Sequence, residues 1–105
     1  MDKFTKLVVK TLEDHKASDI SVIDVKEKTP FADYYVLATA SNNRQLNALA
    51  DAVEEALEKA KFSIGHIEGK AESGWILIDA HHIIVNIFSA QERERISLDE
   101  LLNRK

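Results

Sequence analysis

Carboxylates and imidazoles are the side chains of this sequence that could do chemistry, since hydrolases and metal-dependent transferases need several of them at one point. Asp24 and Asp33 could approach each other if their strands are neighbours. However, no Asp-x-Asp or Glu-x-Asp pair lies on a predicted strand. The alternative is that these acids satisfy main-chain amides at turns and strand ends. We therefore expect no catalytic residues.

The histidines do not have the spacing of a metal site. His81 and His82 are adjacent, and adjacent side chains on extended backbone point to opposite faces, so this pair cannot chelate one ion from a strand. The helical HExxH spacing is also missing. We predict a water-exposed turn at His81 and His82, and no metal.

Nucleophiles and phosphate-binding loops also lack their usual sequence context. Ser41 and Ser73 lie outside any GxSxG turn, and Ser41 is placed to cap a helix. The strand that ends at Thr39 continues into residues 40–43 without the glycine of a phosphate loop. The absence of cysteine removes thiolate catalysis, disulfides and Cys-bound zinc. We predict no cofactor, with a residual nucleotide-binding transferase as the enzymatic alternative.

Composition and charge predict a folded, acidic protein. Of the 105 residues, 45% are hydrophobic and 30% charged, which is typical of a globular domain. The net charge of −4 gives no positive field for phosphate backbones, and the charges of residues 91–95 cancel one another. There is no apolar run of about 18 residues and no signal-peptide core. We expect one domain over residues 1–105, located in the cytoplasm, without membrane insertion or sequence-specific nucleic-acid binding.

Apolar spacing predicts two long helices that position these residues. Helical periodicity predicts one helix from Phe4 to about Lys16. A second helix starts after the capping residues 41–43 and carries an apolar stripe to Ala60, with Gly65 closing its exit. A capping box at residues 97–100 predicts a further, terminal helix.

Alternating and β-branched patterns predict five strands. The strand at 34–39 is apolar on both faces, so we place it at the centre of the sheet. The last two strands should pair antiparallel across a short turn. The element order predicts an α/β fold with a mixed five-stranded sheet and helices packed on it. The predicted strands cover residues 20–25, 34–39, 64–67, 75–78 and 83–88.

Trp75, the one tryptophan, is the candidate for a protein contact. Tryptophan is both a common core residue and a common interface residue, so both roles remain open. Glu68, Glu72 and Asp79 lie near it in the sequence, and acids around a tryptophan would suit a basic partner. The alternative is that these acids are scattered, solvated surface residues.

A series of segments resembles the Iojap-like ribosomal silencing factors over nearly the whole chain. These segments are, in order, residues 33–41, Gln45 at a helix start, 68–69, 74–79, 85–88, 92–94 and 98–101.

The resemblance implies a fold similar to nucleotidyltransferase domains, without their catalytic residues. It implies binding to the large ribosomal subunit through its basic ribosomal protein number fourteen. The bound domain would block subunit association and repress translation when nutrients are scarce. The family is also similar to proteins that form homodimers. A factor for assembly of the large subunit is the alternative that the sequence does not separate from silencing.

The resemblance also assigns candidate site residues. Gly74, Trp75, Leu77 and Asp79 match the family's tryptophan-centred strand, and we expect them, together with Glu68, to form or support the partner contact.

Three further positions match the family in a structural or dimer role: Asp33, Tyr34 and Gln45. The sequence departs from the family pattern elsewhere, so the resemblance predicts no role for a histidine on the last strand or for C-terminal aromatic residues. The departures are at Ala40, His81, His82, Asn86, Ile96 and Leu102.

Overall fold

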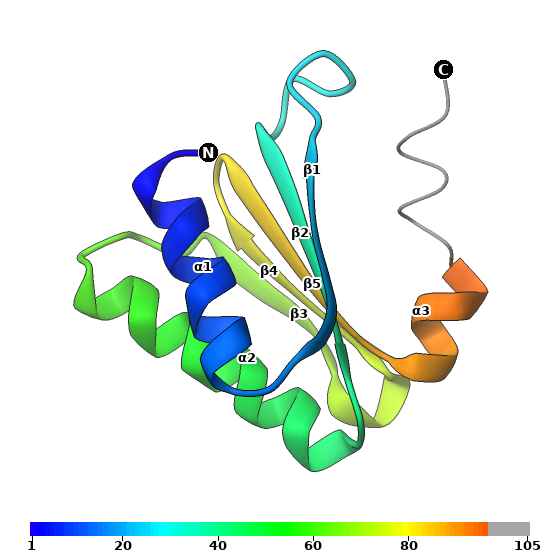
Figure 1. The fold of residues 1–105 in the computed structure, drawn as a ribbon. Coiled ribbons are helices and arrows are strands. Elements are labelled where there is room, and N and C mark those ends of the chain that lie inside the picture. Colours follow the sequence, from blue (N-terminus) through cyan, green and yellow to red (C-terminus); the bar gives the residue numbers. More distant parts are fainter. Residues whose placement is uncertain (97–105) are drawn as a thin grey trace.

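The fold is an α/β arrangement around one mixed sheet, and the computed structural model describes residues 1–96 of it (Figure 1). The sheet order is β1-β2-β5-β4-β3, with β2 and β5 parallel and the other neighbours antiparallel. The predicted mixed five-stranded sheet is confirmed. The elements are α1 (Lys3–Asp14), β1 (Ser18–Asp24), β2 (Tyr34–Ala40), α2 (Asn43–Lys59), β3 (His66–Lys70), the 3-10 turn η1 (Ala71–Ser73), β4 (Trp75–Ala80), β5 (Ile83–Ser89) and α3 (Ala90–Ile96).

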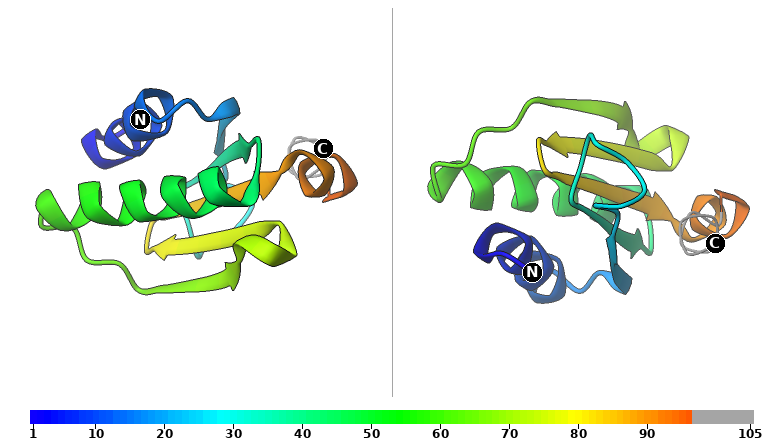
Figure 2. Two further views of the ribbon diagram at one scale, coloured as in Figure 1. Left: turned by 90° about the horizontal axis from the view of Figure 1, so that it is seen from below. Right: turned by 90° about the horizontal axis from the view of Figure 1, so that it is seen from above.

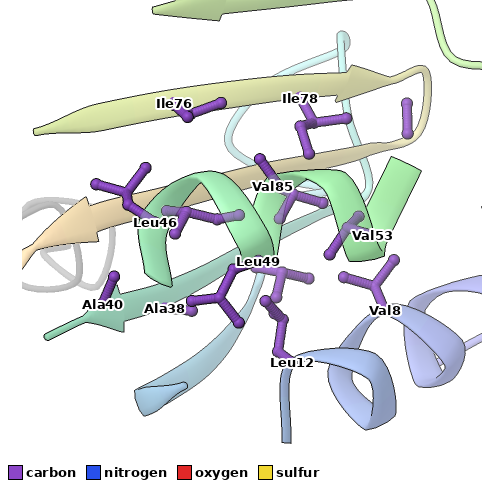
Figure 3. Close-up of a cluster of buried hydrophobic side chains, with 14 of the residues drawn as sticks. Val8, Leu12, Ala38, Ala40, Leu46, Leu49, Val53, Ile76, Ile78 and Val85 are labelled. Carbon is purple, nitrogen blue, oxygen red and sulfur yellow. The ribbon is translucent and has the colours of Figure 1, made fainter. Parts of the chain in front are cut away.

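Helices α1 and α2 lie side by side on one face of the sheet (Figure 2). Their apolar sides meet the alternate residues of β2, β4 and β5 that point toward them, and this forms the main core (Figure 3). Full burial of each large apolar side chain contributes about 1.5–3 kcal/mol. The completely buried members include Val8, Leu12, Val36, Leu46, Leu49, Val53, Leu57, Ile78, Val85 and Ile87.

The opposite side of the sheet, here called the second face, carries a smaller core. The short helix α3 lies at one end of it (Figure 1). Within residues 1–96, no pair of long helices covers this face as α1 and α2 cover the other. Buried residues of the second core are Ile23, Val25, Ala32, Leu37 and Phe88, with Tyr35, Trp75, Ile84 and Ile96 packed against them.

Both long helices end in the same backbone motif, and this corrects the prediction for Gly65. At the end of α2, Lys61 takes a left-handed conformation (φ 60°). The amide of Lys61 donates to the Glu58 carbonyl and that of Phe62 to the Leu57 carbonyl, which satisfies carbonyls that the helix leaves open. Lys16 does the same after α1 (φ 67°). Lys61, rather than Gly65, therefore closes the helix.

The prediction for residues 34–39 holds in part: β2 is an inner strand, largely buried between β1 and β5, but the middle position of the five belongs to β5. The sequence assigned no element to residues 91–95; they belong to α3, whose Arg93 donates to Thr39 Oγ1 (3.1 Å). The predicted helix at 97–100 lies outside the described residues. Within residues 1–96, no helix has the length and apolar character that a membrane crossing needs.

The two edge strands differ. In β1 the register shifts between Ser18 and Ser21, and Asp19 has a left-handed backbone (φ 47°). The carbonyl of Asp19 accepts a hydrogen bond from Arg93 Nη1 (2.8 Å), so part of this edge is occupied by α3. In contrast, β3 pairs with β4 on one side and all five of its residues are exposed.

Candidate functional site

Three rows of side chains cross the second face, because paired residues of neighbouring strands lie on the same face of a sheet. The middle row runs from Glu68 through Leu77, Asn86 and Leu37 to Ser21. Alternate residues of β4 share this face, which brings the predicted Trp75, Leu77 and Asp79 together in one line.

Trp75 is half-buried and has two fixed neighbours on β5. Its indole Nε1 donates a hydrogen bond to Asn86 Oδ1 (3.1 Å). Its ring lies 5.1 Å from that of Phe88, centroid to centroid. The rest of the side chain lines a surface groove. Trp75 is therefore partly a core residue, because it packs on Phe88, and partly accessible, because it lines the groove; its role in a protein contact stays a prediction.

The groove beside it, here called the Trp75 groove, has a volume of about 340 Å³. Strands β3 and β4 supply most of its lining and α3 supplies one wall. Arg95 Nε donates a hydrogen bond to Glu92 Oε2 (2.9 Å), and Arg95 Nη2 lies 2.7 Å from the same oxygen. This interaction raises the pKa of Arg95. The groove thus combines the apolar surface of Trp75 and Leu77 with two carboxylates, Glu68 and Glu92, and the Arg95 guanidinium. Its lining residues are Glu68, Gly69, Ser73, Trp75, Leu77, Glu92 and Arg95.

Gly74 supports the groove by allowing α3 to approach β4. It has a left-handed backbone (φ 79°), and an added Cβ would lie 2.7 Å from Glu92 Cγ and 2.8 Å from Ser89 Oγ. Its carbonyl accepts a hydrogen bond from the Ser89 amide (2.8 Å). Because Gly74 is buried, it shapes the site without offering surface of its own.

Of the three acids predicted to lie around Trp75, only one lines the Trp75 groove. His66 lies between two of them, with Nε2 3.1 Å from Glu68 Oε1 and Nδ1 3.4 Å from Asp79 Oδ2. Glu68 lines the Trp75 groove, Asp79 lies further along the same face, and Glu72 is exposed on η1 outside the lining. Among residues 1–96, no three His, Cys, Asp or Glu side chains are placed to hold a metal ion.

Asp33 and Tyr34 hold together the end of the sheet farthest from the groove. Their amides donate to the His82 carbonyl (2.7 and 3.1 Å). The hydroxyl of Tyr34 accepts a hydrogen bond from Lys26 Nζ (2.8 Å), and this bond, with the charge of Asp24 nearby, raises the pKa of Lys26. Asp24 and Asp33 therefore share one end of neighbouring strands, as the sequence allowed, with a lysine beside them.

The turn between β4 and β5 is only partly exposed. His81 is exposed and adopts φ 65°, as an exposed turn residue. The prediction was wrong for His82, whose Nε2 lies 2.6 Å from Asp2 Oδ2 and whose ring meets that of Phe62 at 5.5 Å. Asp2 also accepts a hydrogen bond from the Thr5 amide (2.8 Å). Burial raises the pKa of Asp2, but these hydrogen bonds outweigh it and leave that pKa below its ordinary value.

These features define an α/β protein with one face of its sheet packed under two helices and a tryptophan groove on the other. The sequence profile described as "Ribosomal silencing factor during starvation" (RsfS) matches residues 1–105. The chain belongs to this family of ribosomal silencing factors.

Known relatives agree with this assignment. The ribosomal silencing factor RsfS of Zymomonas mobilis is 32% identical, over 91% of this chain and 72% of its own. A crystal structure from Chromobacterium violaceum superposes with a TM-score of 0.93 at 30% identity, covering 100% of this chain and 89% of the other. The mouse protein named "Mitochondrial assembly of ribosomal large subunit protein 1" is 26% identical, over 90% of this chain and 43% of its own.

Sequence reasoning missed several residues that line the groove or lie beneath it. Asn86 was noted only as a departure from the family pattern, although a two-residue turn fixes the register that puts it opposite Leu77. Ser73 was considered only as a nucleophile. Glu92 and Arg95 come to the groove because α3, which packs on β5 and β2, carries them next to β4. No local pattern in the sequence predicts that packing.

Proposed function

We propose that this chain binds the large ribosomal subunit through ribosomal protein number fourteen and blocks association with the small subunit, which represses translation when nutrients are scarce. Membership of the ribosomal silencing factor family supports a ribosomal role. The observation that carries the contact is the Trp75 groove on the second face. The interaction takes place in the cytoplasm and involves neither a membrane nor sequence-specific contact with nucleic acid.

The composition of the groove suits a protein partner. Tryptophan is enriched among the few interface residues that supply most of the binding free energy, especially where neighbouring groups exclude water from it. Here Phe88 and Asn86 hold the ring, and Leu77 extends the apolar surface next to it. A residue that is already fixed in place loses little conformational entropy on binding.

The charges around the groove favour a basic partner. Glu68 and Glu92 line it, Asp79 lies on the same face, and the chain has a net charge of −4. In the free protein, His66 lies next to Glu68 and Arg95 lies next to Glu92. A basic partner would supply further positive charge at the same place, which raises the association rate and favours that partner over acidic ones.

Repression by this route needs no covalent chemistry. A folded body of 11.8 kDa that covers part of the subunit interface prevents close approach of the other subunit by its volume alone. The proposal therefore assigns no catalytic residue and no cofactor. Its strength depends on how well a few central contacts fit, since buried area alone does not set affinity.

The test is sedimentation of the protein with separated ribosomal subunits, followed by an increase in magnesium that drives association. We expect comigration with the large subunit and fewer joined ribosomes. Trp75→Ala should weaken comigration at least about tenfold, as expected for a central interface residue. Circular dichroism of the variant must show that it is folded.

Phe31→Ala is the matched control. Phe31 is the most exposed aromatic residue of the described chain (84%) and lies on the loop between β1 and β2, at the opposite end of the sheet from Trp75. It should bind as the wild type does. Loss of binding with Phe31→Ala but not with Trp75→Ala would move the contact to that loop and refute the assignment of the groove.

The second candidate is a role in assembly of the large subunit, which the name of the mouse relative favours. The two functions differ in their target, because silencing acts on mature subunits. Purified protein that binds mature large subunits but leaves their joining unchanged would favour assembly. Accumulation of incomplete large subunits in cells that lack the protein would favour it as well.

A further inference from the structure

We infer that Asn86 is a positioning residue for Trp75: its side-chain oxygen sets the orientation of the indole that forms the groove, at a cost in stability. This inference rests on the proposed function, because it concerns the same groove. Asn86 is 1% exposed, so its side chain lies beneath the groove surface.

The geometry explains how one hydrogen bond can select an orientation. Trp75 pairs across the strands with Phe88, so Asn86 is its diagonal neighbour, two residues earlier on β5. Phe88 packs against the indole, but apolar packing is non-directional and does not by itself specify which edge of the ring faces β5. The indole has a single N–H, and the bond from Nε1 to Asn86 Oδ1 (3.1 Å) fixes which edge faces the strand.

The same bond identifies which terminal atom of the Asn86 side chain is the oxygen and which is the nitrogen. Indole N–H is a donor only, so the atom that faces it must be the oxygen. The amide nitrogen, Nδ2, then points elsewhere. It is buried and has no hydrogen-bond partner among the described residues.

Stability alone would favour an apolar side chain at this position. The row that contains Asn86 places Leu77 on one side and Leu37 on the other. A buried donor without an acceptor destabilises a fold, and an apolar group of similar shape removes that cost. The asparagine is therefore explained by what its oxygen does for Trp75, which is an exchange of stability for a fixed binding surface.

Two variants separate positioning from a merely structural role. Asn86→Leu has the same branching but no acceptor. We expect a melting temperature equal to or above that of the wild type, Trp75 emission at longer wavelength with stronger iodide quenching, and binding to large subunits weakened about tenfold. Trp75 is the one tryptophan of the chain, so its emission reports this site alone.

Asn86→Asp retains an oxygen for the indole and introduces a buried carboxylate. We expect a lower melting temperature, while emission and binding stay within about twofold of the wild type, a difference too small for the loss of a central contact. Stability and binding would then be uncoupled: the Leu variant keeps its stability and loses binding, whereas the Asp variant loses stability and keeps binding. Binding that follows the melting temperature in both variants would overturn the inference. The Leu variant decides alone if the Asp variant does not fold.

The two proposals fail in different ways. Emission is measured on the protein without ribosomes, so it tests the orientation of Trp75 even if the wild type does not bind large subunits, an outcome that would refute the proposed function. If the wild type binds and Asn86→Leu changes neither emission nor binding, the role of Asn86 is refuted and the proposed function remains.

Discussion

The side-chain amide of Gln45 donates a hydrogen bond to the main-chain carbonyl of Lys16 (3.1 Å), although 29 residues separate them. It also donates to the His15 carbonyl (3.3 Å), while its oxygen accepts from the amide (2.6 Å) and hydroxyl (2.9 Å) of Ser41. One side chain at the start of α2 therefore satisfies the exit of α1, where carbonyls lack helical partners.

Gln45→Glu should destabilise the fold by about 1–2 kcal/mol, because the carboxylate keeps the acceptor for Ser41 but cannot donate to His15 and Lys16. Urea unfolding measures the change. Asn47→Asp is the control, since it adds the same charge to an exposed position of α2. Equal effects of the two substitutions would show that charge, and not the lost donor, is responsible.

Thr11→Val should destabilise the protein by about 1 kcal/mol, because Thr11 Oγ1 donates to the Leu7 carbonyl (2.8 Å). Thr5→Val, on the same helix, should have a smaller effect. The Thr5 hydroxyl is buried and makes no hydrogen bond of good geometry among the described residues, but it lies near the Asp2 carboxylate and helps to lower its pKa. Equal loss of thermal stability in the two variants would contradict this account.

Lys61→Gly should stabilise the protein by about 1 kcal/mol, since glycine adopts the left-handed backbone of Lys61 without steric cost. Lys59→Gly is the comparison. Lys59 is the last residue of α2 and pairs with Glu55 (2.8 Å), so glycine there should destabilise. Urea midpoints that fall for both variants would show that the conformation of Lys61 is not strained.

Gly74→Ala should cost at least about 1–2 kcal/mol from its left-handed backbone alone, and it would also push α3 away from β4. Binding to large subunits should fall with it. Gly65→Ala has no positive φ to oppose it, and its stability should stay within about 1 kcal/mol of the wild type. Calorimetry tests both, and equal stability of Gly74→Ala and wild type would refute the close approach of α3.

The pKa of Asp2 gives a pH dependence with a definite sign. A carboxyl whose pKa is lowered by folding stabilises the fold above its unfolded pKa of about 3.8, and this contribution is lost as pH falls through the lower, folded pKa. Asp2→Asn still caps α1 but does not ionise. Below about pH 4 the stability of the wild type should fall more steeply than that of the variant. Parallel curves would rule out this role of Asp2.

Local patterns predicted the elements whose causes are local. The caps at residues 41–43 predicted the start of α2, which Asn42 does cap, and the apolar run at 34–39 predicted β2. The place of β2 in the sheet, by contrast, depends on which strand pairs with β5. For α3 the stabilising contacts are distant, since Arg93 reaches Thr39 and Ser21, 54 and 72 residues away.

The candidate site was predictable to the same extent. Alternation along a strand was enough to put Trp75, Leu77 and Asp79 on one face. The second acid of the groove was not predictable. The sequence suggested Glu72, but Glu92 lines the groove instead, because α3 brings it there. Gly74 was assigned to the partner contact by resemblance, and that assignment stays a prediction; what the structure shows is that Gly74 leaves space for Glu92.

The unequal edges of the sheet limit how copies of this protein can associate. An incoming strand could add along β3, whereas the register shift and the Arg93 contact disfavour addition along β1. In a pair joined through β3, the β3 edge of each copy would be covered by the β3 edge of the other. If copies of this chain associate by strand pairing, one usable edge per copy would limit them to a closed dimer.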